Sequence, residues 1–172
     1  MSVYAQFALN NAYANRTLYG AIAGMDRAAF LAERPGFFPS LAATLNHIYE
    51  VDLFYIDALE EGGLGRSVYE RRDIEDVGAL AAAQAEADMR LAMFCSGEID
   101  LARVVPVERK GEMTRESVGA LLPHLFQHQV HHRGQAHVQV GDAGIAPPQL
   151  DDFFLEHGRS PIAAEYFLGG RE

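Results

Sequence analysis

Four long segments with few helix-breaking residues dominate this chain of 172 residues and constrain its fold more than any other feature. Ser40 and Asp76 are predicted N-caps of the second and third segments, and Gly62 and Gly97 lie just beyond the ends of those two. The predicted helices cover residues 3–25, 41–61, 76–96 and 114–142. Four such helices with short loops and one long crossover, placed after either the second helix or the third, predict an all-α four-helix bundle.

The segments between the predicted helices carry turn residues and one extended stretch. The sequence PGFFPS, residues 35–40, separates the first two helices, and a loop rich in glycine and arginine follows the second. Three valines before the turn signal Lys110-Gly111 predict a short extended or hairpin excursion over residues 103–114. Pro106 would confine any strand there to the edge of a sheet.

Prolines set two further expectations towards the C-terminus. Pro123 lies within the fourth segment and predicts either a kink or the true first turn of that helix. In the tail, PPQLDDFFLEHG and SPIAAEYFL predict two short helices packed back on the body, the second with Ser160 as its cap and Pro161 at its first position. The length favours a single domain over residues 1–172.

Charge and cysteine content exclude several classes of protein. The formal net charge is −10, and an acidic surface repels phosphate backbones and anionic lipid, so we expect neither a nucleic-acid partner nor a membrane partner. The single cysteine, Cys95, cannot form an internal disulfide, and its apolar neighbours predict buried packing rather than a reactive thiol. The N-terminal sequence does not resemble a signal peptide and no apolar run approaches ~20 residues, so we expect a cytoplasmic protein.

The sequence HLFQHQVHHRGQ, residues 124–135, contains four of the seven histidines. At about 100° per residue, His124, His128, His131 and His132 fall within an arc of roughly 80–100° on one helix face. Two pairs with a spacing of four residues, His124/His128 and His128/His132, can each offer two nitrogens to one metal ion. Helix geometry alone does not choose between these pairs.

A further ligand must come from another segment, and His47 in the middle of the second predicted helix is the candidate. Its face also carries Val51, Phe54 and Ala58, so the imidazole points into packed surface. A buried imidazole needs partners for both nitrogens, and a metal ion on one with a carbonyl or carboxylate on the other would supply them. A hydrogen-bonded core histidine is the alternative interpretation of His47.

Other catalytic and metal-binding patterns are absent from the sequence. There is no HExxH motif, which excludes a zincin, and no glutamate three residues before a histidine, which excludes the ferritin-like di-iron pattern. Neither a calcium loop nor a GxSxG elbow occurs, and nitrogen ligands disfavour calcium and magnesium. The histidines therefore carry the chemistry that this sequence predicts.

Four stretches together resemble the DinB family of metal-dependent proteins: NNAYANRTLY, FFPSLAATLNHIYEVD, HLFQHQVHHRGQAH and PPQLDDFFL. The resemblance implies a DinB/YfiT-like bundle, often a homodimer, that binds nickel, zinc or a similar divalent ion. Its metal triad maps onto His47, His128 and His132, and it leaves His124 and His131 for roles beside the ligands, in a pocket or at a dimer interface. The chain departs from the family after the LNHxxxxD motif, where a tryptophan is usual and this sequence offers Phe54 and Tyr55.

Three imidazoles leave at least one coordination position open, which is typical of catalytic metal sites. We therefore predict a metal-dependent enzyme, either a thiol S-transferase that uses a low-molecular-weight thiol, as some relatives do, or a hydrolase. Candidate helpers are Glu50, Asp52, Arg133 and Gln135, although surface charge pairing would equally explain Arg133, and helix capping would explain Asp151. The alternative is a non-catalytic metal-binding stress-response protein in which the ion stabilises the bundle; a DNA-binding factor conflicts with the net charge.

The second predicted helix is apolar on two sides, which is more than one core contact requires. One stripe is the face that carries His47, and the other consists of Leu41, Leu45, Ile48, Tyr55 and Leu59. We expect either a second subunit of a homodimer or the C-terminal tail to cover the extra stripe.

Overall fold

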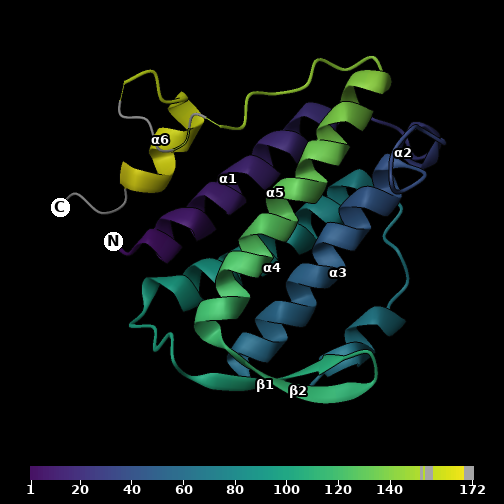
Figure 1. Cartoon of the computed structure of the whole chain (residues 1–172). Coiled ribbons are helices and arrows are strands. Elements are labelled where there is room, and N and C mark those ends of the chain that lie inside the picture. Colours follow the sequence, from purple (N-terminus) through teal and green to yellow (C-terminus); the bar gives the residue numbers. More distant parts are fainter. Residues whose placement is uncertain (152, 154–156, 169–172) are drawn as a thin grey trace.

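The computed structural model describes residues 1–151, 153 and 157–168, and four long helices form its body (Figure 1). These are α1 (Val3–Ile22), α3 (Leu41–Glu60), α4 (Val77–Ser96) and α5 (Val118–Asp142). The shorter elements are α2 (Arg27–Leu31), the 3-10 helix η1 (Gly65–Glu70), the strands β1 (Val104–Arg109) and β2 (Glu112–Ser117), and α6 (Pro161–Leu168). The predicted four-helix bundle is confirmed, and none of the described helices is long and apolar enough to cross a membrane.

The long helices are arranged so that α1 and α3 each pack against both α4 and α5. Thr44, near the start of α3, donates to Gln139, near the end of α5, because these two helices run antiparallel. Asn46 bonds to Ile74, just before α4, so α3 and α4 run in the same direction. The long crossover is therefore the one after the second long helix: it returns along the bundle and contains η1 (Figure 1).

Side-chain caps determine where the helices begin. Five residues each accept a hydrogen bond from the backbone N–H three positions on, namely Ser2, Asp26, Ser40, Asp76 and Ser117. The predicted caps of the second and third long helices are confirmed. Ser117 starts α5 well before Pro123, so the interpretation of that proline as the first turn is wrong; the kink stays a prediction.

The observed elements depart from the predicted ones at three places along the chain. The first helix ends at Ile22 rather than residue 25, because Asp26 caps a new short helix, α2. The glycine- and arginine-rich loop contains η1. In the tail, α6 begins at Pro161 as predicted, whereas the other short helix was expected over residues 147–158, of which 152 and 154–156 lie outside the described residues.

The predicted hairpin is present as an antiparallel pair of strands that crosses one end of the bundle (Figure 1). Lys110 and Gly111 form its turn with φ of 52° and 85°, the left-handed conformation that two-residue hairpin turns require. Pro106 pairs with Arg115, and because the sheet has only two strands both are edges that tolerate proline.

The core consists of two large apolar clusters with buried polar residues between them, and a smaller third cluster joins Tyr13 of α1 to Ala163 of α6. Phe54, Leu91 and Leu125 belong to the cluster nearer the hairpin, and Leu18 and Leu45 to the one nearer α2. Between these levels lie seven buried polar side chains, here called the polar layer: Asn11, Asn15, Asp52, Gln84, Asp88, Gln129 and Arg133.

Both apolar stripes of α3 are covered within the chain itself. Leu45 and Ile48 pack with α1, α4 and α5 in one cluster, and Tyr55 and Leu59 lie in the other. The shorter elements α2, η1 and β1 also pack on α3, whereas α6 packs on α1. Neither a second subunit nor the tail is needed to cover the extra stripe, so the sequence argument for a dimer based on it is wrong.

Candidate metal centre

Three histidines from two helices converge in the structure. His47, His128 and His132 each offer a ring nitrogen, and these atoms all lie within 4.8 Å of one another. The Nε2 atoms of His47 and His128 are 3.1 Å apart. Two nitrogens that bind one tetrahedral ion at about 2.0–2.1 Å are separated by about 3.3 Å, so this spacing fits a shared divalent ion. We call these residues the histidine cluster.

Helix geometry explains the convergence. His128 and His132 are one turn apart on α5, and their ring centroids are 4.4 Å apart. The α3 helix packs antiparallel against α5 and brings His47 opposite them, with centroid distances of 5.0 Å to His128 and 4.6 Å to His132. The structure thus brings together the pair and the distant partner that the family resemblance selects.

The histidine cluster is held in the neutral form that binds metal ions. Burial lowers the pKa of His47 to about 4, and burial together with the neighbouring histidines lowers the pKa of His128 to about 3. Burial also lowers the pKa of His132. At neutral pH all three rings can offer a lone pair without first losing a proton.

Hydrogen bonds orient one ring of the cluster and leave another without a partner. His132 Nδ1 lies 2.9 Å from Gln135 Oε1, which assigns the proton to Nδ1 and leaves Nε2 as the free lone pair. Gln135 Nε2 in turn lies 3.1 Å from Nε2 of the exposed His131. The buried Nδ1 of His128 has no hydrogen-bond partner among the described residues. Gln135 therefore links His131 to His132 of the cluster.

The alternative pair His124/His128 is not the one that the structure brings together. His124 is exposed, and its ring packs edge-on against Tyr55 at a centroid distance of 5.1 Å. Burial and the charge of Arg109 lower the pKa of His124. The side chain thus lies one turn of α5 away from the cluster, facing the hairpin end of the molecule.

An aromatic wall that the sequence analysis did not anticipate covers one side of the cluster. Phe38 stacks against His47 at 4.5 Å between centroids and lies 5.6 Å from His132. Phe37 is next to it and 79% exposed. Both come from the PGFFPS segment, whose position before the cap of α3 was visible in the sequence, but its folding back over His47 depends on tertiary contacts such as the bond from Gln139 to the Phe38 carbonyl.

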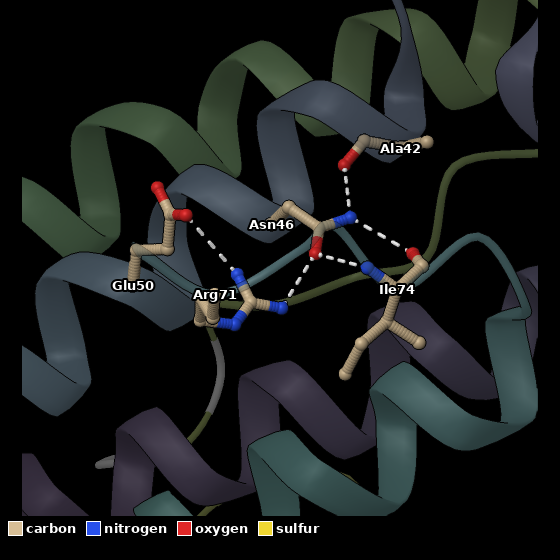
Figure 2. A network of polar contacts seen from close by, with 5 residues as sticks. All are labelled: Ala42, Asn46, Glu50, Arg71 and Ile74. Atoms are coloured by element: carbon tan, nitrogen blue, oxygen red, sulfur yellow. Dashed lines mark hydrogen bonds and ion pairs between the residues drawn. The ribbon is translucent and has the colours of Figure 1, made fainter. Parts of the chain in front are cut away.

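The residue before His47 anchors the crossover to α3 (Figure 2). Asn46 Nδ2 donates to the carbonyls of Ala42 and Ile74, and its Oδ1 accepts from the Ile74 N–H and from Arg71. Arg71 also pairs with Glu50 at 3.2 Å. Through these bonds Asn46 fixes η1 beside the face of α3 that carries His47.

Of the residues predicted to assist the metal site, some contact the histidine cluster and others lie in the core. Gln135 contacts His132, whereas Glu50 is engaged by Arg71. Asp52 and Arg133 belong to the buried polar layer, so surface charge pairing does not describe Arg133. A rotation of 100° per residue turns Arg133 away from the face of α5 that its neighbour His132 occupies.

The polar layer is a continuous hydrogen-bonded unit. Asp52 accepts from Gln84 and Gln129, and Asp88 accepts from Asn11, Asn15 and Gln84. Arg133 donates to the side-chain oxygens of Asn11 and Asn15. Burial raises the pKa of Asp52 to about 7 and that of Asp88 to about 6, against the opposing effect of these donors.

Two further residues considered in the sequence lie away from the cluster. Cys95 is fully buried, and burial raises the pKa of its thiol to about 12, so the prediction of inert packing is confirmed. Asp151 accepts from the side chain of Gln149, two residues before it. Neither residue contributes to the candidate metal centre.

Comparison with known proteins agrees with this fold. The DinB family model matches residues 1–163. The Protein DinB of Bacillus subtilis (strain 168) is 24% identical over 151 residues, which covers 82% of this chain and 86% of that protein. The crystal structure of a DinB-like protein from Bacillus cereus ATCC 10987 aligns with a TM-score of 0.61 at 17% identity, covering 80% of this chain and 90% of the other, and so shares the fold. Because the family model spans nearly the whole chain, this protein belongs to the DinB family.

Proposed function

We propose that His47, His128 and His132 bind a divalent metal ion, nickel or zinc, and that the protein is a metal-dependent enzyme of the thiol S-transferase or hydrolase type. The observation that carries the proposal is the convergence of three ring nitrogens within 4.8 Å. Imidazole nitrogens suit nickel and zinc better than calcium or magnesium. Three protein ligands also leave a coordination position for a substrate.

The chain's own residues prepare this site. An ion bound by three neutral imidazoles lowers the pKa of a coordinated water or thiol. Phe38 shields His47 and His132 on one side, so solvent and substrate approach from the other. Gln135 holds the His132 ring by its Nδ1, which keeps Nε2 directed at the shared position.

A purely structural role for the ion receives less support from the packing. Both helices that carry the histidine cluster are embedded in the apolar clusters, and the polar layer ties them to α1 and α4. Helices held in this way do not need a metal ion to associate. We therefore favour catalysis over the non-catalytic stress-response alternative.

Elemental analysis of protein purified without added metal tests the site directly. We expect close to one nickel or zinc ion per chain in the parent and none in His47→Ala, while His157→Ala, which alters a histidine remote in sequence from the cluster, retains the ion. Thiol conjugation and ester hydrolysis are then assayed with the metal-loaded parent. A parent that is metal-free as purified and that fails to take up added nickel or zinc would contradict the proposal.

The remaining expectations from the sequence and from the family resemblance are proposals of the same kind. We infer a single domain over residues 1–172, a cytoplasmic location, a low-molecular-weight thiol as partner and a homodimer. A cleft of about 490 Å³ between α1 and α4, whose lining includes five alanines, two glycines and Met89, supports the dimer, because a second copy would bury its apolar surface. Light scattering in solution measures the oligomeric state.

A further inference from the structure

A cleft of about 310 Å³ lies between the hairpin, η1 and the hairpin end of α3. Its aromatic lining consists of Phe54, Tyr55 and Tyr69, and its charged lining consists of Arg66, Glu108, Arg109 and Lys110. Figure 1 shows η1 and the hairpin together at the end of the bundle where α3 finishes and α5 starts. The cleft is therefore built by α3 together with two elements outside the long helices, the hairpin and η1.

The charge of this cleft is opposite to that of the whole chain. Three of its lining residues are basic and one is acidic, in a protein with 14 basic and 24 acidic residues. Glu108 pairs with Arg66, and Glu116 pairs with Arg109. Lys110 makes no ion pair with any described residue. One positive charge is thus left over once the internal pairs are formed.

The internal ion pairs leave the side chains of Arg66 and Arg109 partly exposed, at 53% and 39%. Arg66 and Arg109 each use Nε for the carboxylate contact, at 3.7 Å and 3.4 Å. Arg109 Nη1 donates to the Tyr55 hydroxyl at 3.2 Å. The guanidinium groups lie over the rings of Tyr69 and Tyr55, both at 5.8 Å, which keeps them at the cleft wall.

The cleft lies close to the histidine cluster, which it approaches through Tyr55. Tyr55 lines the cleft and packs on His124, which is one turn of α5, or about 6 Å, from His128. Along α3, Tyr55 follows His47 by about 12 Å. A single elongated small molecule can therefore reach from the cluster into the cleft.

We propose that Arg66, Arg109 and Lys110 bind a carboxylate of the substrate whose reacting group lies at the histidine cluster, an inference that rests on the proposed function. A carboxylate matches the single surplus positive charge, and the terminal guanidinium nitrogens offer it charge-assisted hydrogen bonds. The aliphatic or aromatic part of the substrate packs on Tyr55 and Tyr69. The preferred substrate is thus an acidic molecule with about 10 Å between its carboxylate and its reacting group.

Three thiols of equal chain length test this inference with the nickel-loaded protein. These are 6-mercaptohexanoate, 6-mercaptohexanol and 6-aminohexanethiol, titrated by the thiolate-to-nickel charge-transfer absorption. We expect the acid to bind about tenfold more tightly than the alcohol, and the amine more weakly than both, because a hydrogen bond to a charged group contributes about that much. Equal affinities for the acid and the alcohol would overturn the inference.

A matched pair of variants separates the effect of the cleft on thiol binding from the effect of the overall charge. The triple variant R66Q/R109Q/K110Q should lose the preference for the acid but keep its affinity for the alcohol. The triple variant R16Q/R27Q/R90Q removes the same amount of charge from arginines paired with Glu165, Glu75 and Glu60 outside the cleft, and should keep the preference. Retention of the preference in the first variant would also overturn the inference.

A metal-free measurement distinguishes failure of the inference from failure of the proposed function. Calorimetric titration with hexanoate should show binding to the parent and none to R66Q/R109Q/K110Q. If no thiol gives an absorption band but hexanoate still binds in this way, the proposed thiol chemistry fails and the carboxylate site stands. If hexanoate does not bind the parent and no thiol gives a band, both are wrong.

Discussion

The histidine cluster and the polar layer include neighbouring residues of α5, but their ionisable groups differ in their hydrogen-bond partners. His128 and His132 are followed directly by Gln129 and Arg133. In the cluster, two ring nitrogens face each other at 3.1 Å, and a buried nitrogen of His128 has no partner among the described residues. In the polar layer, donors from α1, α4 and α5 satisfy both carboxylates, and the atoms without a partner among the described residues are the amide oxygens of Gln84 and Gln129. The first arrangement is the proposed metal site, and the second ties the helices to one another by hydrogen bonds.

This contrast predicts that the largest loss of stability follows from a change in the polar layer. Arg133→Met removes the cation that lies among Asp52, Asp88 and two asparagine oxygens, all of them buried. Breaking a buried charge network by removing one partner costs about 3–5 kcal/mol of unfolding free energy. Urea denaturation of metal-free protein measures this loss.

Arg90→Met provides the matched control for that measurement. Arg90 pairs with Glu60 at 2.6 Å on the surface, where the two side chains are 40% and 35% exposed. Exposed pairs contribute about 1 kcal/mol or less, so this variant should stay close to the parent. Equal losses in the two variants would contradict the assignment of the polar layer as the unit that holds the bundle together.

A pH dependence of the unfolding free energy should arise from the ionisation of Asp52. Burial raises the pKa of this carboxyl in the folded protein to about 7, above its value in the unfolded chain. Its contribution to stability is therefore fully present below pH ~4 and is lost as the pH rises through about 7. The lowered pKa values of the three histidines act in the opposite direction, because their contribution is lost as the pH falls below ~6.5.

Asp52→Asn separates the contribution of this carboxyl to the pH dependence from the contribution of the histidines. An asparagine stays neutral at all of these pH values. Its side-chain N–H can donate to the Oε1 atom of Gln84 or of Gln129 once that glutamine amide is flipped, because neither oxygen has a partner among the described residues. The difference in unfolding free energy between this variant and the parent should shift in favour of the variant between pH 5 and pH 8. Glu86→Gln, which neutralises an exposed carboxylate on α4, should show no such shift. A pH-independent difference for Asp52→Asn would rule out the buried ionisation.

The same contrast explains what the sequence could predict. The histidine cluster was accessible because a spacing of four residues places His128 and His132 on one helix face, and the family resemblance supplied His47. The polar layer contains the same spacing three times, in Asn11/Asn15, Gln84/Asp88 and Gln129/Arg133. Polar pairs at this spacing also occur on exposed helix faces, so the sequence alone does not show that these face inwards. Only the packing of four helices around them makes that distinction.

The cleft at the hairpin was beyond prediction for a different reason. The hairpin itself follows from local turn chemistry at Lys110-Gly111, and it was predicted. Its position relative to η1 depends on long-range contacts, such as the bonds from Asn46 to the crossover, that no local pattern encodes. Residues that act together across such contacts, like Arg66 and Arg109, become apparent only in the folded chain.

The smallest change in stability is expected for a substitution in the histidine cluster, the proposed metal site. His128→Ala removes a half-buried neutral ring whose Nδ1 has no partner among the described residues, so the metal-free unfolding free energy should stay within about 1 kcal/mol of the parent. With nickel at 100 times the dissociation constant, the parent should gain about 2.7 kcal/mol. His128→Ala should gain almost nothing, whereas His124→Ala, which alters the exposed histidine one turn earlier, should gain as much as the parent. The reverse result would assign the second ligand of α5 to His124, and a large metal-free loss in His128→Ala would show that the cluster, like the polar layer, serves the fold.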